Sequence, residues 1–279
     1  MANFPGPGKL VPLGVIRSRW VSPRSVTVWL PPDYENHRQL DWDRYGVLYM
    51  HDGQNLFESD KSFTGVDWGV PATLAHLIRE RLVPPTIVVG VGNTGLRMSE
   101  YMPAQALEFI DRHPQGRDIL SSVAHPGLSE GYLRFLVEEL KPLIDSRFYT
   151  RPQARHTSTM GSSMGGLISL NAVCQYPEVF GAAGCLSTHW PAGDGAVLDY
   201  LDRALPRVGN HRFYFDYGTE TADAPYEPYQ RGADQIMQKH GYRARTDYLT
   251  LKFPGEEHSE RAWRARLHLP LRFVLAGTH

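Results

Sequence analysis

The sequence contains little cysteine, no surplus of charge of either sign and no long apolar run. Its two cysteines, Cys174 and Cys185, stand apart in apolar surroundings, so neither a disulfide framework nor a zinc site is expected. The 29 basic and 30 acidic residues leave a net charge of -1, which excludes the basic footprint of a nucleic-acid-binding protein. No run reaches the ~18 apolar residues that span a bilayer. We therefore expect neither a nucleic-acid partner nor a membrane partner.

The first residues also lack the marks of an export signal. MANFPGPGKLVP has no basic segment followed by an apolar stretch, which is the pattern of a secretory signal peptide. We therefore expect a cytoplasmic protein. Residues 1–12 are rich in proline and glycine and are expected to form a loose arm.

The composition and the order of apolar segments are those of a globular α/β chain. Apolar residues make up 42% of the chain and charged residues 21%, which excludes a disordered protein. Residues 45–50 and 86–91 are near-continuous apolar runs that predict strands buried on both faces. Further strands are expected at 13–20, 25–30, 156–160, 179–186, 212–217 and 247–253. Helices are expected at 69–80, 131–148, 164–175, 228–241 and from about residue 260.

Strands that alternate with helices predict a mostly parallel sheet with helices on both faces. The first two strands are close in sequence, which predicts an antiparallel N-terminal edge. Because no repeat or linker is present, we expect a single domain over residues 1–279. Residues 92–131 have weak periodicity, which is typical of a long binding loop or lid. Its apolar side chains would form a partly apolar mouth: Met98, Tyr101, Met102 and Phe109.

One motif carries chemistry. Residues 161–165, GSSMG, match the pattern G-x-S-x-G between a predicted strand and a predicted helix. The glycines allow a sharp turn that lifts the central serine above the sheet edge in a strained conformation. The first N–H groups of the following helix point to the same place. We interpret Ser163 as the candidate nucleophile, and the alternative is a Gly/Ser turn without chemistry.

A serine nucleophile needs a base, and the base needs an orienting carboxylate. In proteins with this motif the chain order is serine, acid, histidine. His258 lies shortly after the last predicted strand, where the base is required. The acid should follow the strand at 212–217, and both Asp223 and Glu220 lie there. We favour Asp223, but the sequence leaves the choice open.

Attack by the serine produces an oxyanion, which needs two backbone N–H donors. The first is expected to be the N–H of Met164, the residue after the nucleophile. The second is expected to be the N–H of Gln54, because the strand at 45–50 runs directly into HDGQN and Gly53 allows a close approach. On its own, DGQN is equally typical of a plain turn.

Together these segments resemble the putative esterase family of α/β hydrolases, which includes esterase D, enterochelin esterases, feruloyl esterase domains and mycolyltransferases. The resemblance covers the chain from about residue 13 onward and rests on five segments: LYMHDGQNLF (48–57), RMSEYMP (97–103), GSSMGGLISL (161–170), FDYGTET (215–221) and GEEHSERAWRARL (255–267). It implies the α/β-hydrolase fold, a Ser-His-acid triad and the oxyanion donors named above. It also implies that Arg97, Glu100 and Tyr101 shape the pocket or anchor its loop through a salt bridge, and that Trp263 is a packing residue.

We therefore expect a serine hydrolase that cleaves a small-molecule carboxylic ester through an acyl-enzyme, without metal or organic cofactor. The predicted substrate-binding residues are Arg97, Tyr101, His189 and Trp190. Acyl transfer on the same triad and a non-catalytic binding module on the same fold are alternatives. A metal-dependent hydrolase is a further alternative, for which the sequence offers no ligand spacing. The natural ester and the oligomeric state are not indicated by the sequence.

Overall fold

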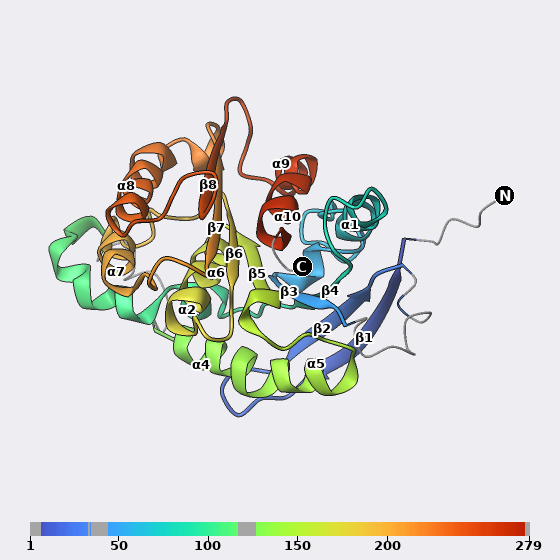
Figure 1. The fold of residues 1–279 in the computed structure, drawn as a ribbon. Helices are drawn as coiled ribbons and strands as arrows, with labels where there is room; N and C mark the ends of the chain where they lie inside the picture. The colour runs from blue at the N-terminus through green and yellow to red at the C-terminus, as the bar shows by residue number, and fades with distance from the viewer. Residues whose placement is uncertain (1–6, 33, 35–43, 117–126, 277–279) are drawn as a thin grey trace.

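An eight-stranded sheet forms the centre of the computed structural model, which describes residues 7–32, 34, 44–116 and 127–276. The strands lie in the order β1-β2-β4-β3-β5-β6-β7-β8 (Figure 1). Their bounds are β1 (Lys9–Ile16), β2 (Arg24–Leu30), β3 (Gly46–His51), β4 (Thr86–Val91), β5 (Thr157–Ser162), β6 (Ala182–Leu186), β7 (Arg212–Gly218) and β8 (Tyr248–Phe253). Strands β3 to β8 pair in parallel, whereas β1 and β2 pair antiparallel at the edge. The predicted fold class is confirmed.

Helices cover both faces of the sheet and enclose two apolar cores (Figure 1). The first face carries α2 (Arg97–Tyr101), α4 (Ser129–Arg134), α5 (Lys141–Arg147), α6 (Met164–Gln175), α7 (Ala196–Ala204) and α8 (Tyr226–Lys239). The second face carries α1 (Val70–Arg79), α9 (Glu260–Arg266) and α10 (His268–Leu275). Side chains of β3 alternate between the cores, with Tyr49 in the first and Leu48 in the second. This explains why the central strands are apolar at every position.

The long helix predicted over 131–148 is present, with an irregular middle. Helices α4 and α5 are joined by one stretch of π-helix, η3 (Phe135–Leu140). Pro142 lies in the first turn of α5 and has no N–H to donate to the preceding turn. The wider π-helical turn lies where the regular hydrogen-bond ladder would otherwise reach the proline.

Two segments differ from their predictions. Residues 9–12 belong to β1 rather than to the loose arm predicted over 1–12, because an edge strand tolerates Pro12 at a bulge. Residues 92–131, predicted as a loop, contain α2 and the 3-10 helix η2 (Ala104–Arg112). Three of the four side chains that were predicted to form an apolar mouth are instead buried in the interior, so the prediction is wrong for them: Tyr101, Met102 and Phe109. Residues 1–6 and 117–126 lie outside the described part of the chain.

The structure shows where the two cysteines lie and how apolar the described helices are. Cys174 in α6 and Cys185 in β6 are free thiols inside the first core. Burial raises the pKa of the Cys174 thiol to about 12 and also raises the pKa of Cys185. Among the described helices, none combines the length and the apolar character needed to cross a bilayer.

A buried ion pair fastens α2 to the sheet. Arg24 of β2 donates from Nη2 to Oε1 of Glu100 over 2.6 Å and from Nη1 to Oε2 over 3.1 Å. Both side chains are fully buried. The guanidinium also lies 5.1 Å from the ring centre of Tyr132. Glu100 is therefore an interior anchor, the second of the two roles that the resemblance implied for its segment.

Replacing Glu100 should destabilise the fold. Glu100→Leu leaves the Arg24 cation buried without its partner, so we expect the free energy of unfolding to fall by about 3 kcal/mol or more. Urea unfolding followed by fluorescence measures this change. Glu108→Gln is the matched control, because its pair with Arg203 is exposed on both sides, and no measurable change is expected there. Equal losses in the two variants would contradict the assignment.

Candidate active site

Ser163 occupies the sharp turn between β5 and α6. Its backbone has φ 59° and ψ -123°, a strained conformation for a residue with a side chain. The Ser163 N–H donates to the carbonyl of Leu186 over 2.9 Å, and its carbonyl accepts from the His189 N–H over 3.2 Å. A Cβ at Gly161 would lie 2.8 Å from the backbone of Gly165, so only glycine fits where strand and helix meet. The turn therefore has the geometry that the motif predicts.

His258 and Asp223 form a short hydrogen-bonded pair beside this turn. Nδ1 of His258, in the loop after β8, lies 2.6 Å from Oδ1 of Asp223. Asp223 ends the short 3-10 helix η5 (Thr221–Asp223) that follows β7, and its side chain is fully buried. Glu220 is exposed, and its carboxylate accepts from the Thr219 hydroxyl. The structure thus places Asp223, rather than Glu220, against the histidine.

Asp223 is held by groups from three strand ends. Its Oδ2 accepts from Ser187 Oγ over 2.6 Å and from the Gly218 N–H over 2.6 Å. Burial alone would raise the pKa of Asp223, but its hydrogen bonds from His258, Ser187 and Gly218 outweigh burial and hold the pKa below the ordinary value. The carboxylate therefore stays charged at neutral pH and can orient the imidazole.

Ser187, which was not predicted from the sequence, is the residue through which further supporting groups reach Asp223. Its buried hydroxyl accepts from Trp263 Nε1 over 3.0 Å and from Arg266 Nη2 over 2.9 Å, while it donates to Asp223. Arg266 in turn forms a buried ion pair with Asp216 of β7 over 2.9 Å. The only sequence signal was a polar residue directly after a buried strand at the edge where the other site residues lie.

Two aromatic rings lie edge-on to the imidazole of His258. The Trp263 ring is 5.0 Å away at 82°, and the Tyr226 ring is 5.9 Å away at 84°. Trp263 therefore has the packing role that the resemblance implied. With Asp223 bound to Nδ1, the ring is restrained in position and in rotation.

The loop after β3 reaches the turn through another ion pair. Arg97 donates to Oδ1 of Asp52 over 2.8 Å and to Oδ2 over 2.7 Å, and its Nη2 also lies 3.4 Å from the carbonyl of Ser162. Asn93 Nδ2 donates to the same carboxylate over 2.6 Å. Burial would raise the pKa of Asp52, but the charge and hydrogen bonds of Arg97 outweigh it and hold the pKa below the ordinary value. This pair ties the loop that carries Gln54 to the end of β5.

Gln54 lies in the 3-10 helix η1 (Gly53–Asn55), directly after Asp52. A Cβ at Gly53 would lie 2.5 Å from the backbone of Gly90, so the loop packs tightly over the end of β4. Met164 is the first residue of α6, and the first N–H groups of a helix have no partner within it. The structure therefore places both predicted oxyanion donors on segments next to Ser163.

These groups surround a cleft of about 480 Å³. Ser163, His258, Gln54 and Arg97 of the predicted site line it, and the other lining residues are Asp52, Asn55, Phe63, Thr64, Asn93, Ser162, Glu260 and Trp263. The Phe63 side chain is 90% exposed, so the rim carries an unpacked aromatic ring. The cleft thus has polar walls with aromatic surface at Phe63 and Trp263.

Three of the four predicted substrate-binding residues are not among the residues that line the cleft. Tyr101 is fully buried below Arg97, whose guanidinium lies 5.2 Å from its ring centre. Trp190 is buried and donates from Nε1 to Gln230 over 2.8 Å. Substrate contact by these two side chains is therefore not supported. His189 lies instead against Tyr226, with Nδ1 2.6 Å from the phenol oxygen.

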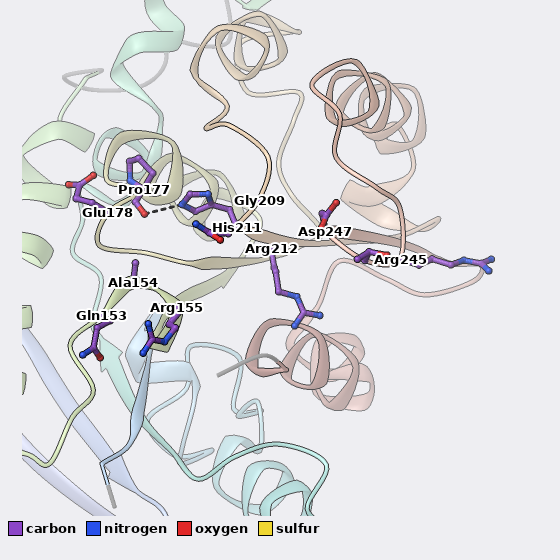
Figure 2. A pocket seen from close by; sticks show the side chains of 12 residues that line it. Gln153, Ala154, Arg155, Pro177, Glu178, Gly209, His211, Arg212, Arg245 and Asp247 are labelled. Carbon is purple, nitrogen blue, oxygen red and sulfur yellow. Dashed lines mark hydrogen bonds between the residues drawn. The ribbon is translucent and has the colours of Figure 1, made fainter. Parts of the chain in front are cut away.

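Elsewhere the structure offers a larger hollow. A hollow of about 920 Å³ lies at the opposite edge of the sheet, where β5 and β7 begin (Figure 2). Arg155, His211, Arg212 and Arg245 are among its lining residues, but no predicted catalytic residue is. In the described residues, no group of three or more histidine, cysteine or acidic side chains is placed to hold a metal ion. Size alone therefore does not identify the reactive cleft.

Comparison of the sequence with curated proteins gives two informative relatives, both from Bacillus subtilis (strain 168). The uncharacterized protein YbbA is 24% identical over 197 residues, which cover 71% of this chain and 68% of YbbA. The ferri-bacillibactin esterase BesA is 28% identical over 154 residues, which cover 52% of this chain and 49% of BesA. The match thus spans about half the length of BesA.

Solved structures with a similar fold include several esterases. A ferulic acid esterase superposes with a TM-score of 0.68 at 18% identity, covering 96% of this chain and 98% of the other. An IroE-like serine hydrolase from Shewanella oneidensis gives 0.70 at 19% identity, with coverage of 96% and 80%. The enterobactin esterase Fes from Shigella flexneri gives 0.67 at 18% identity, with coverage of 96% and 59%. At these identities the likeness establishes the α/β-hydrolase fold.

Family membership comes from the sequence itself. The family model described as "Putative esterase" matches residues 19–273, which is most of the chain. The match includes the turn at Ser163, the pair of Asp223 and His258, and the loop of Gln54. The chain therefore belongs to the "Putative esterase" family and is a carboxylic ester hydrolase.

Proposed function

We propose that this esterase acts through Ser163 as nucleophile, His258 as general base and Asp223 as the group that orients the imidazole. One observation carries the proposal: the short His258–Asp223 hydrogen bond of 2.6 Å belongs to a histidine that lines the same cleft as Ser163 on its strained turn. With Nδ1 bound to the carboxylate, Nε2 is left to accept the proton of the serine hydroxyl.

The reaction then follows from the positions of the donors. As Ser163 Oγ bonds to the acyl carbon, His258 takes the hydroxyl proton and the carbonyl oxygen becomes an oxyanion. The N–H groups of Gln54 and Met164 are the proposed donors to that oxygen, each contributing about 3 kcal/mol to the transition state. His258 then protonates the leaving alcohol, and a water activated by the same imidazole hydrolyses the acyl-enzyme.

The cleft favours a small-molecule ester with a flat or apolar group. Its volume of about 480 Å³ is in the ordinary range for small-molecule pockets. Phe63 at the rim and Trp263 on the wall offer aromatic surface, while Arg97 and Glu260 offer charge. Similar proteins are named for ferri-bacillibactin, ferulic acid and enterobactin, so esters related to these compounds are the first natural substrates to test.

Loss of the nucleophile should abolish turnover without unfolding the chain. For Ser163→Ala we expect hydrolysis of p-nitrophenyl acetate to fall by at least ~10³-fold, because no acyl-enzyme can form. Initial rates over a series from p-nitrophenyl acetate to p-nitrophenyl decanoate measure this loss and size the acyl pocket. A thermal melt is the control for folding. A variant with full activity would refute the serine mechanism.

The two candidate acids can be separated by matched amide substitutions. Asp223→Asn should lower kcat about 10³- to 10⁴-fold, because an amide stabilises neither the correct tautomer nor the imidazolium. Glu220→Gln, at an exposed side chain that accepts a hydrogen bond from the Thr219 hydroxyl, should change kcat less than about twofold. Steady-state kinetics on the same p-nitrophenyl ester measures both. The reverse pattern would move the acid to Glu220.

The support of the Gln54 loop should depend on pH. The pKa of Asp52 is lower in the folded chain than its ordinary value of 3.8, so the folded state binds fewer protons than the unfolded state. Its stabilisation is therefore fully present at a pH well above 3.8 and is lost as the pH falls below that value. Asp52→Asn removes this contribution and leaves Arg97 without its partner.

We expect the difference in unfolding free energy between wild type and Asp52→Asn to be largest near neutral pH and to shrink as the pH falls from 5 to 3. Urea titrations at several pH values measure it, and other titrating groups cancel in the difference. Parallel profiles over the whole range would show that Asp52 is not paired in the folded chain.

A further inference from the structure

The region beside Ser163 contains a buried phenol that the mechanism above does not use. Tyr226 is the first residue of α8, three positions after Asp223, and its side chain is fully buried. Its ring lies edge-on to His258 at 5.9 Å. Tyr226 therefore approaches the proposed triad from the interior, and it is not among the residues that line the cleft.

The hydroxyl of Tyr226 lies between two partners. Nδ1 of His189 is 2.6 Å from the phenol oxygen, and the two rings meet edge-on at 5.8 Å. The second neighbour is the side chain of Ser163, which lies close enough to the phenol to lower its pKa as a hydrogen-bonding group. The His189 N–H also donates to the carbonyl of Ser163 over 3.2 Å, so the three residues are fixed to one another through side chains and backbone.

The phenol of Tyr226 and the imidazole of His189 are both electrically neutral at pH 7. Burial, reinforced by the charge of Asp223, raises the pKa of Tyr226, so the phenol keeps its proton. Burial and the neighbouring His258 and Arg97 lower the pKa of His189 to about 4. A neutral imidazole can carry its proton on Nδ1 and donate it to the phenol oxygen, which leaves the phenol hydrogen free for Ser163.

The serine oxygen becomes electron-rich twice in the reaction. It does so when His258 removes its proton and Oγ bonds to the acyl carbon, and again when the Oγ–acyl bond breaks and Oγ recovers a proton from His258. The N–H groups of Gln54 and Met164 serve the carbonyl oxygen and not Oγ. A hydrogen-bond donor aimed at Oγ would stabilise the negative charge on this oxygen in both steps.

We propose that Tyr226 is a further catalytic residue, whose hydroxyl donates a hydrogen bond to Ser163 Oγ as this oxygen attacks and as it leaves, and that His189 is the positioning residue that holds the hydroxyl from its other side. The proposal rests on the serine mechanism proposed above. No proton is transferred from Tyr226 at any step, so His258 remains the only base and acid. His189 thus acts through Tyr226 and not on the substrate, which differs from its predicted role.

Tyr226→Phe tests the donor directly, because the ring stays against His258 and only the hydroxyl is lost. We expect kcat for p-nitrophenyl acetate, and the rate at which a fluorophosphonate labels Ser163, to fall about tenfold, the effect of one hydrogen bond of ordinary strength. KM should change less than about twofold. Tyr229→Phe is the matched control one turn along α8: it also loses a phenol hydrogen bond, to Asp194 over 2.7 Å, and should leave both rates unchanged.

A double-variant cycle tests the positioning role of His189. His189→Leu should slow labelling about as much as Tyr226→Phe, and it should have no further effect in the Tyr226→Phe background. His189→Asn keeps a polar atom near the position of Nδ1 and should recover most of the rate. A merely structural role would instead give losses that add, with no rescue by asparagine.

Each outcome decides between the proposals. Ser163-dependent labelling that is as fast in Tyr226→Phe as in wild type overturns the donor role while the serine mechanism stands. Faster labelling also overturns it, since the phenol would then hold the serine away from His258. Additive losses overturn the role of His189. Wild-type protein that is neither labelled nor active on any p-nitrophenyl ester overturns the serine mechanism and this proposal together.

Discussion

The arrangement of the site depends on how the chain buries the carboxylate of Asp223. A charged group without solvent is costly unless hydrogen bonds replace its hydration. Here they come from Ser187 after β6, from Gly218 at the end of β7 and from His258 after β8. Ser187 is itself fixed by Arg266 and Trp263 of α9. The same contacts that make the carboxylate tolerable inside the protein therefore position the imidazole.

The parallel sheet explains why these segments meet at one edge. The strands β3, β5, β6, β7 and β8 are consecutive neighbours of the sheet, and each ends where a site segment begins. Helix α6 begins at that edge and directs its free N–H groups toward Ser163, so this edge favours developing negative charge. The opposite edge has the larger hollow but no member of the proposed triad (Figure 2).

The parts of the site that could be predicted from sequence are those encoded locally. The turn at Ser163 is specified by glycines between a strand and a helix, and His258 by its place after the last strand. The sequence favoured Asp223 as the acid but left Glu220 open, because the two share one loop and are distinguished by contacts with His258, Ser187 and Gly218.

Features that depend on distant partners were missed. Ser187 and Tyr226 are unremarkable in sequence, and they gain their meaning from side chains that are remote along the chain. The interior roles of Tyr101 and Trp190 were missed for the same reason, because an aromatic residue beside a motif is equally typical of a pocket wall and of a core. The short helices between residues 97 and 112 have too few turns to show a period, and Pro103 interrupts them.

The two buried cysteines give the chain a built-in reporter of local opening. Both thiols are buried in the native state. Cys174 lies in α6, the helix that begins at the nucleophile turn, and Cys185 lies in β6, the strand that leads to Ser187. Because burial keeps both thiols protonated, a maleimide or disulfide reagent can modify them only in conformations where these elements have opened. The rate of thiol modification would thus read the opening free energy of the elements on either side of the nucleophile, without any label being introduced.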